Sequence, residues 1–308
     1  MDAGGLDSDG RGFSSAKEMW REEIGIGEAK DGSKRHEWYR KGIAYWQAVE
    51  ASVDGVLGGY GHVNEADVKG SAAFLNTLLP NRFGTERRHL VALDCGSGIG
   101  RVTKNLLLRF FNEVDLVEPV SHFLESAREN LALDGDSEND AHKAVNFYCV
   151  PLQVIFFLLH IVIQFCVFVI LPWKINCLFV QEFTPEVGRY DVIWIQWCIG
   201  QLPDDDFISF FKRAKAGLKP NGLFVVKENI ASNGFVLDKE DHSITRSDLY
   251  FKQLFNQCGL YIYSTKDQKG FPEEIFAVKM YALVTEKPKG VSNGRSKRQR
   301  HKPALIKS

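Results

Sequence analysis

The sequence predicts an α/β fold built on a mostly parallel sheet, and three observations support that prediction. From Leu90 onward, short apolar runs alternate with helical stretches, the pattern of strand–helix–strand units. A glycine-rich turn, Gly96–Gly100, directly follows the first of these strands. The 308-residue chain is 44% apolar and 25% charged, which excludes collagenous, wholly disordered and multi-span membrane proteins. We expect one domain, residues 37–286, with a seven-stranded sheet preceded by helices.

The N-terminal third is expected to begin with a disordered leader. Residues 1–36 are polar and rich in glycine, and we expect them not to pack. Apolar residues then recur at three- and four-residue steps over 38–49 and 67–79, which predicts two amphipathic helices. The glycine-rich run at 55–61 separates them, and Pro80-Asn81 is expected to end the second.

The sheet region follows as alternating elements. The expected strands are 90–93, 114–117, 145–150, 190–196, 223–227, 260–265 and 276–284. The expected helices between them are 101–111, 121–131, 204–216 and 247–258, with a turn at 219–222. The last two strands close the domain and could pair antiparallel.

Charge is distributed unevenly along the chain. The 38 basic and 39 acidic side chains nearly cancel, but residues 287–308 hold eight Lys/Arg and no acid, so the rest carries a formal charge of −9. We expect 287–308 to be a disordered basic tail. Its basic hexamer, residues 297–302, has two interpretations. One is a nuclear localisation signal or nucleic-acid contact patch, and the other is a solvated tail. The expected location is cytoplasm and nucleus; no aromatic residues are interleaved to support sequence-specific RNA reading.

Neither metal binding nor secretion is indicated by the sequence. The six cysteines form no CxxC pair and no Cys/His cluster with zinc-ligand spacing, so we expect no metal. The first 15 residues contain no apolar run of the kind that a secretory signal needs. A reducing, intracellular setting is therefore the default expectation.

The glycine turn carries the most chemical information. Its spacing is GxGxG and Asp94 precedes it, whereas a dinucleotide fingerprint is GxGxxG. An acid at this point would repel a pyrophosphate but suits the cationic amino group of S-adenosylmethionine. Glu118 ends the second strand, where a carboxylate can accept both ribose hydroxyls, and Pro119 and Val120 would flank the adenine or ribose. The pattern favours an adenosyl cofactor without a phosphate chain, the Rossmann-like arrangement of class I S-adenosylmethionine-dependent methyltransferases.

Longer segments resemble the protein α-N-terminal methyltransferases, and most closely the plant-type members. The matching segments are 58–62, 93–101, 190–197, 219–222, 227–229 and 236–241, within a resemblance that runs from about residue 45 to residue 284. That family methylates the free N-terminal amine of proteins beginning Xaa-Pro-Lys/Arg. The resemblance therefore implies that the partners of this chain are N-terminal tails of this kind.

The resemblance also implies residue roles. It assigns S-adenosylmethionine contacts to Gly96, Arg101, Glu118, Leu152, Gln153 and Gln196. It assigns the peptide channel to Trp46, Trp197, Asn229, Asp238, Asp241 and Ser243. The aromatic rings would pack on proline, and the carboxylates would take the basic third residue. An acidic body suits such a cationic tail.

Methyl transfer to an amine requires a neutral nitrogen. An α-amino group with a pKa near 8 is about a tenth deprotonated at pH 7, so positioning should contribute more than proton removal. Asp241 and Asn229 are the expected catalytic residues, with Asp241, alone or through water, as the base. Many family members have a histidine at the position of Gln201, which cannot titrate, and we expect slower turnover or a steeper pH dependence here.

An apolar stretch interrupts the resemblance. Residues 154–171 are apolar except for His160 and Gln164, which meets the loose length criterion for a membrane span. A span there would separate two strands of one sheet across a bilayer. Deleting 154–181 joins Gln153 to Glu182 and restores the family's continuity, so we interpret the stretch as a retained intron or equivalent gene-model error, with a functional membrane element as the alternative. Membrane contact is expected only if the stretch is translated and exposed.

Two rival functions stay open at this stage. One is a side-chain or small-molecule methyltransferase on the same fold. The other is a catalytically impaired binding protein, inactivated by the insertion and by Gln201.

Overall fold

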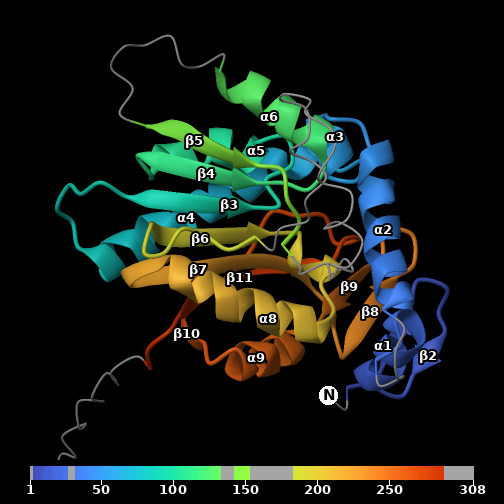
Figure 1. Cartoon of the computed structure of the whole chain (residues 1–308). Coiled ribbons are helices and arrows are strands. Elements are labelled where there is room, and N and C mark those ends of the chain that lie inside the picture. Colours follow the sequence, from blue (N-terminus) through green and yellow to red (C-terminus); the bar gives the residue numbers. More distant parts are fainter. Residues whose placement is uncertain (1–2, 27–31, 133–141, 153–182, 288–308) are drawn as a thin grey trace, which may run out of the picture.

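A seven-stranded sheet forms the centre of the molecule (Figure 1). The computed structural model describes residues 3–26, 32–132, 142–152 and 183–287. The strand order is β10-β11-β7-β6-β3-β4-β5; β11 pairs antiparallel with both β10 and β7, and the other neighbouring strands pair in parallel. The strands are β3 (Val91–Cys95), β4 (Glu113–Val117), β5 (Lys143–Tyr148), β6 (Tyr190–Gln196), β7 (Leu218–Ile230), β10 (Tyr261–Asp267) and β11 (Ala277–Val284). The predicted α/β class, the mostly parallel sheet and the antiparallel closing pair are confirmed.

Helices cover both faces of this sheet. The helices are α1 (Ala16–Ile24), α2 (Ser33–Ala48), α3 (Val53–Val56), α4 (Asn64–Phe83), α5 (Arg101–Asn105), α6 (Ser121–Ala132), α8 (Asp204–Ala214) and α9 (Asp248–Gln257). Short 3-10 turns are η1 (Gly61–Val63), η2 (Leu107–Arg109), η3 (Ile199–Gln201) and η4 (Lys215–Gly217). One apolar core joins α1, α2, α8 and α9 to one face, and a second joins α4, α5 and α6 to the other. The site must therefore lie at an end of the sheet.

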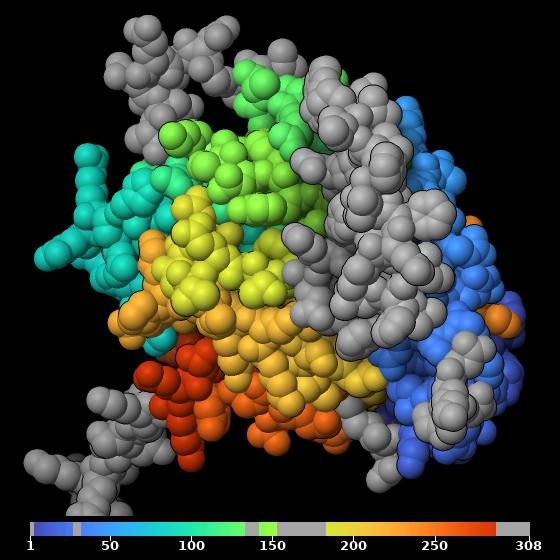
Figure 2. All heavy atoms as spheres, in the orientation of Figure 1, coloured from blue at the N-terminus to red at the C-terminus, as the bar shows by residue number. Residues whose placement is uncertain are grey.

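The expected disordered leader is wrong for residues 3–26. They form β1 (Gly5–Asp7), β2 (Gly12–Phe13) and α1. Ser15 caps α1 by accepting a hydrogen bond from the Glu18 backbone N–H, and Trp20, Met19 and Phe13 are buried. Figure 2 shows this segment, in dark blue, against the lighter blue surface of α2. The mean polarity of residues 1–36 concealed these few large apolar side chains, which are enough to anchor the segment.

A second, four-stranded sheet was also missed. Its order is β2-β1-β8-β9, where β8 is Phe235–Asp238 and β9 is Ser243–Arg246. No element was predicted between the strand 223–227 and the helix 247–258, the region that contains Asp238 and Asp241. They lie instead at the tip of the β8–β9 hairpin, whose orientation is fixed by pairing on both sides of β8.

Smaller differences concern the ends of elements. Pro80 lies inside α4, which continues to Phe83, and the expected turn at 219–222 is absorbed into β7, where the pairing with β6 shifts register after Tyr190. The proposed insertion, 154–181, and the tail from 288 onward lie outside the described residues. In the part of the chain that the structure describes, no helix is both long and apolar enough to cross a membrane.

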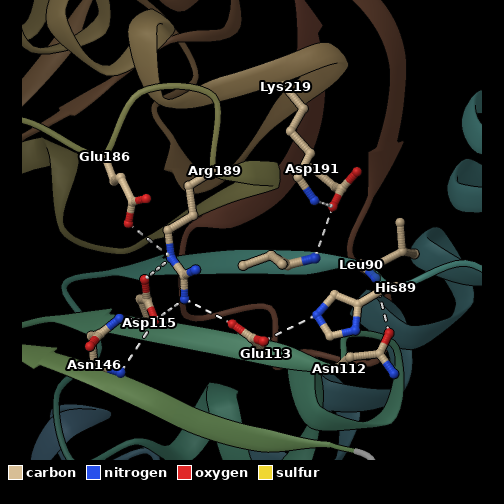
Figure 3. Close-up of polar contacts among 11 residues, drawn as sticks. His89, Leu90, Asn112, Glu113, Asp115, Asn146, Glu186, Arg189, Asp191 and Lys219 are labelled. Atoms are coloured by element: carbon tan, nitrogen blue, oxygen red, sulfur yellow. Dashed lines mark hydrogen bonds and ion pairs between the residues drawn. The ribbon is translucent and has the colours of Figure 1, made fainter.

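An ionic cluster ties the strands together at their amino ends (Figure 3). Asp115 of β4 is fully buried and accepts hydrogen bonds from Arg189 Nε at 2.7 Å, the Tyr190 hydroxyl at 2.9 Å and Asn146 Nδ2 at 3.0 Å. Arg189 also pairs with Glu113 at 2.9 Å. The charged side chains at this end of the sheet thus pair with one another and have a structural role.

Replacing the central acid of this cluster should be costly. We expect Asp115→Ala to lower the free energy of unfolding by about 3 kcal/mol, because it leaves the buried Tyr190 hydroxyl without its acceptor and removes the buried one of the two carboxylates that hydrogen-bond to Arg189. Glu186→Ala is the matched control: its carboxylate is exposed and 3.8 Å from the same arginine, so its loss should cost under about 0.5 kcal/mol. Urea denaturation measures both, and similar values for the two variants would contradict the assignment.

Candidate active site

The glycine turn lies at the opposite, carboxyl end of the sheet. Gly96, Gly98 and Gly100 have φ angles of 66°, 53° and 74°, in the left-handed region that favours glycine. The backbone N–H groups of Gly96 and Ser97 donate to the Val117 carbonyl at 2.8 and 3.1 Å. A Cβ on Gly96 would lie 2.4 Å from the Cβ of Cys198. The turn is therefore pressed between the ends of β4 and β6, with no room for a side chain at Gly96.

Glu118, directly after β4, fastens this turn. One of its carboxylate oxygens accepts from the Gly98 N–H at 2.8 Å and the other from the Val120 N–H at 2.9 Å. The side chain is 5% exposed, and this burial raises the pKa of Glu118 to about 7 despite the two hydrogen bonds. Each oxygen retains a lone pair for a further donor.

A small cavity of about 150 Å³ opens beside the turn and Glu118. The predicted cofactor residues that line it are Gly96, Arg101, Glu118, Pro119, Val120, Leu152 and Gln196. Gln153 lies outside the described residues. Asp94 also lines the cavity; its buried carboxylate accepts from the Thr103 hydroxyl at 2.7 Å, and burial raises its pKa to about 7.

Asp67, which was not among the predicted site residues, organises two of these side chains. Its carboxylate accepts from Arg101 Nη1 at 2.7 Å and from Gln196 Nε2 at 2.9 and 3.0 Å, and pairs with Lys227 Nζ at 2.5 Å. All four side chains are buried. Desolvation lowers the pKa of Lys227 to about 8, opposed by Asp67. Asp67 therefore fixes the orientation of Arg101 and Gln196 from behind the cavity wall.

A larger cavity of about 1390 Å³ lies beside the first. All six predicted peptide-channel residues line it: Trp46, Trp197, Asn229, Asp238, Asp241 and Ser243. Six acids are among its lining residues, namely Glu228, Asp238, Asp241, Asp248, Glu273 and Glu274. No Lys, Arg or His lines this cavity among the described residues. The channel therefore favours a cationic occupant.

Trp197 stands between the two cavities. It lies directly after β6 with a φ of 52°, and it lines both cavities together with Trp46, Val56 and Gln201. The guanidinium carbon of Arg101 and Nζ of Lys227 lie 5.7 and 5.9 Å from its ring centroid. This ring is thus held by the same buried network that orients the small cavity's polar residues.

Asp241 lies in the tight turn between β8 and β9. Burial raises its pKa to about 6, opposed by hydrogen bonds from Ser243. Its Oδ1 is buried and has no partner among the described residues. Oriented with its nitrogen toward the turn, the Gln201 amide donates to the backbone carbonyls of Asp241 at 3.1 Å and His242 at 3.0 Å. Asp241 therefore lines the channel with one of its carboxylate oxygens unpartnered, in a turn that Gln201 holds in place.

The neighbouring Glu228 has a supporting role. Its carboxylate is buried and accepts from the backbone N–H groups of Cys198 at 3.1 Å and Ile199 at 3.2 Å, and burial raises its pKa to about 7. These bonds connect β7 to the segment that follows Trp197. Asn229, the next residue, thereby lies at the end of a fixed strand.

Comparisons with known proteins agree with this geometry. The family model described as AdoMet-dependent proline di-methyltransferase matches residues 34–157 and 172–284. The chain belongs to this family. A curated rice protein, "Alpha N-terminal protein methyltransferase 1", is 61% identical, with both chains covered completely. "N-terminal Xaa-Pro-Lys N-methyltransferase 1" of Xenopus tropicalis is 37% identical, covering 80% of this chain and 95% of the relative. A solved SAM-dependent methyltransferase from Leishmania major is 36% identical with a TM-score of 0.73, covering 92% of this chain and 97% of that one.

The cofactor of this proline di-methyltransferase family member is S-adenosylmethionine, and the residues that line the small cavity suit its chemistry. Glu118 offers acceptor capacity for two hydroxyls, and Gly96, which has no side chain, lines the cavity with its backbone. Pro119, Val120 and Leu152 supply an apolar wall. The described residues contain no group of three or more His, Cys, Asp or Glu that could hold a metal ion.

The family match is interrupted between residues 157 and 172, within the stretch interpreted above as a retained intron. It resumes at residue 172, nine residues before Gln181, the expected end of the insertion. The interpretation as an intron therefore stays a prediction, to be tested by sequencing the transcript.

Proposed function

We propose that the protein transfers methyl groups from S-adenosylmethionine to the free N-terminal α-amine of proteins that begin Xaa-Pro-Lys or Xaa-Pro-Arg. The observation that carries this proposal is the acid-lined channel meeting the cofactor cavity at Trp197. Such a channel suits a substrate whose amine and third side chain are both cationic. The names of the rice and Xenopus relatives support the same substrate class.

Each residue of the channel has a separate role in the proposed reaction. S-adenosylmethionine supplies an electrophilic methyl group when it is bound. Asp241, with its unpartnered Oδ1, accepts a proton from the substrate ammonium and so frees the nitrogen lone pair. Trp197 and Trp46 form an apolar surface for the proline ring, and Asp238 pairs with the basic third side chain. Asn229, at the end of β7, offers an amide to the peptide's polar groups and orients the amine.

The test is a comparison of peptides with the full-length protein. Methyl transfer to Ala-Pro-Lys and Ser-Pro-Lys peptides should exceed transfer to Ala-Ala-Lys, to Ala-Pro-Glu and to an acetylated Ala-Pro-Lys peptide. Faster transfer to free amines or to internal lysine side chains would favour the small-molecule or side-chain alternative. Cofactor binding by calorimetry without transfer to any peptide would favour a non-catalytic binding protein.

Gln201 gives a separate prediction about rate. Gln201→His introduces a second titratable group next to Asp241, so we expect a higher kcat or a flatter pH profile for kcat. The measurement is kcat on an Ala-Pro-Lys peptide from pH 6 to 9. If kcat and its pH profile are both unchanged, Gln201 does not slow the reaction and this prediction is wrong.

We also propose, from the basic hexamer at 297–302 alone, that the protein divides between cytoplasm and nucleus. Imaging of the full chain against a variant with these basic residues replaced by glutamine tests this.

A further inference from the structure

The N-terminal segment, residues 3–26, lies before the family match, which begins at residue 34. It nevertheless contacts the hairpin that carries Asp238 and Asp241. β1 pairs in parallel with β8, Gly5 opposite Phe235 through Asp7 opposite Leu237, and the Ser8 N–H donates to the Leu237 carbonyl at 2.8 Å. The edge of the hairpin is thereby extended by two more strands (Figure 1).

The same segment neutralises a cation close to the acidic tip. Lys239 lies between Asp238 and Asp241 in sequence, yet it does not line the channel. Its ammonium pairs with Asp9 at 2.7 Å and with Asp7 at 3.6 Å. Asp7 is itself buried and held by the backbone N–H groups of Asp9 and Arg11 at 3.0 and 2.8 Å. The two N-terminal acids therefore draw Lys239 away from the side of the hairpin that the channel uses.

A second contact reaches the tip through α1 and α2. Trp20 of α1 packs edge-on against Trp38 of α2, with 5.3 Å between ring centroids. The Trp38 indole N–H donates to the Gln201 carbonyl at 2.9 Å, and its ring lies 5.4 Å from the His242 ring. Gln201 in turn holds the carbonyls of Asp241 and His242. The hairpin tip is thus contacted by α2, on which α1 packs, as well as by the N-terminal acids.

We propose that residues 3–26 act as a positioning element for peptide recognition, fixing the β8–β9 tip and keeping Lys239 out of the channel, so that the cationic peptide meets Asp238 and Asp241 unneutralised. This rests on the proposed function. The segment does not touch the cofactor cavity: none of its residues lines it. Its influence falls on peptide capture, which separates it from a general stabilising role.

The first test adds one methyl group to β1 in order to displace that strand from β8. A Cβ on Gly5 would lie 2.4 Å from the Phe235 carbonyl oxygen, so Gly5→Ala must push β1 away from β8. Gly12→Ala in the neighbouring β2 is the matched control, since its Cβ would meet only Leu6 Cδ2 at 3.9 Å. We expect Gly5→Ala to raise KM for an Ala-Pro-Lys peptide about tenfold, with kcat and the Kd for S-adenosylmethionine within twofold of wild type, and Gly12→Ala to change none of these.

The second test alters charge alone. Asp7→Asn with Asp9→Asn keeps the side-chain acceptors but releases Lys239, and should raise the peptide KM about threefold to fivefold at low salt. Adding Lys239→Gln to that pair should bring the peptide KM most of the way back to the wild-type value. Normal peptide KM in both the Gly5→Ala and the double-asparagine proteins overturns the inference, as does an equal loss of cofactor affinity. Failure of the wild-type protein to methylate Xaa-Pro-Lys peptides would instead overturn the proposed function.

Discussion

Asp241→Asn is expected to lower kcat on an Ala-Pro-Lys peptide by about a hundredfold at pH 7, with little change in the Kd for S-adenosylmethionine. The reason is that the carboxamide cannot accept a proton, whereas the carboxylate, with a pKa raised to about 6 by burial, can. The reacting pair in the wild-type protein is the Asp241 carboxylate with the protonated amine. The kcat/KM of the wild-type protein should therefore rise with pH up to about 6, where Asp241 becomes ionised. It should then stay constant up to the amine's pKa near 8.

The variant should follow a different pH profile. With no base, Asp241→Asn can use only the neutral amine, so its kcat/KM should keep rising with pH up to about 8. Asp238→Asn is the matched control in the same hairpin: it should raise the peptide KM while keeping the rise that ends near pH 6. If Asp241→Asn retains the wild-type profile, proton acceptance belongs to another group.

Glu118→Gln is expected to weaken S-adenosylmethionine binding by about a hundredfold. The carboxylate accepts from the Gly98 and Val120 N–H groups, and a carboxamide would turn an NH₂ group toward one of these donors. The glycine turn would then lose one of its two attachments. Isothermal titration calorimetry measures the affinity, and Glu125→Gln, on the neighbouring helix α6 and not among the residues that line the cavity, is a suitable control.

The same carboxylate should make cofactor binding pH-dependent. Burial raises the pKa of Glu118 to about 7, so near neutrality part of the free protein carries the protonated form. Hydroxyl donors favour the ionised form, and the affinity of the wild-type protein should therefore increase from pH 6 to pH 8, with release of a proton. Glu118→Gln should lose this dependence. A dependence that persists in the variant would assign it to Asp94, whose pKa is raised to a similar value.

The sheet could be read from the sequence because its strands are short apolar runs bounded by turns. Tyr190–Gln196 was predicted with its observed bounds, and the other strands within a few residues. The position of the cofactor cavity followed from one rule, that sites in parallel sheets form at the carboxyl ends of strands. Gly96 and Glu118 satisfy that rule from two adjacent strands.

The N-terminal segment and the hairpin could not be read in the same way. β1 and β2 are only three and two residues long, too short for periodicity to appear. β1 pairs with β8, more than 220 residues away in sequence, and β2 pairs with β1. β8 and β9 have four residues each. Such elements are specified by tertiary contacts rather than by local pattern.

The buried network at Asp67 left a signal that the sequence analysis did not use. Lys227 ends a run of apolar residues in a central strand, where an unpaired ammonium would be very costly. Asp67 likewise lies on the apolar face of α4 with Val68, Phe74 and Leu75. A buried cation and a buried acid in separate elements could have been predicted to pair, although not to hold Arg101 and Gln196 as well.

All the charged side chains that line the channel among the described residues are acids, and this affects the end of the catalytic cycle. Methylation leaves the substrate nitrogen cationic, so the product is attracted as strongly as the peptide that entered. At low ionic strength, departure of the product should then limit turnover, whereas high salt should screen the carboxylates and slow capture. Such a channel implies an optimum of turnover at intermediate ionic strength, with burst kinetics on its low-salt side.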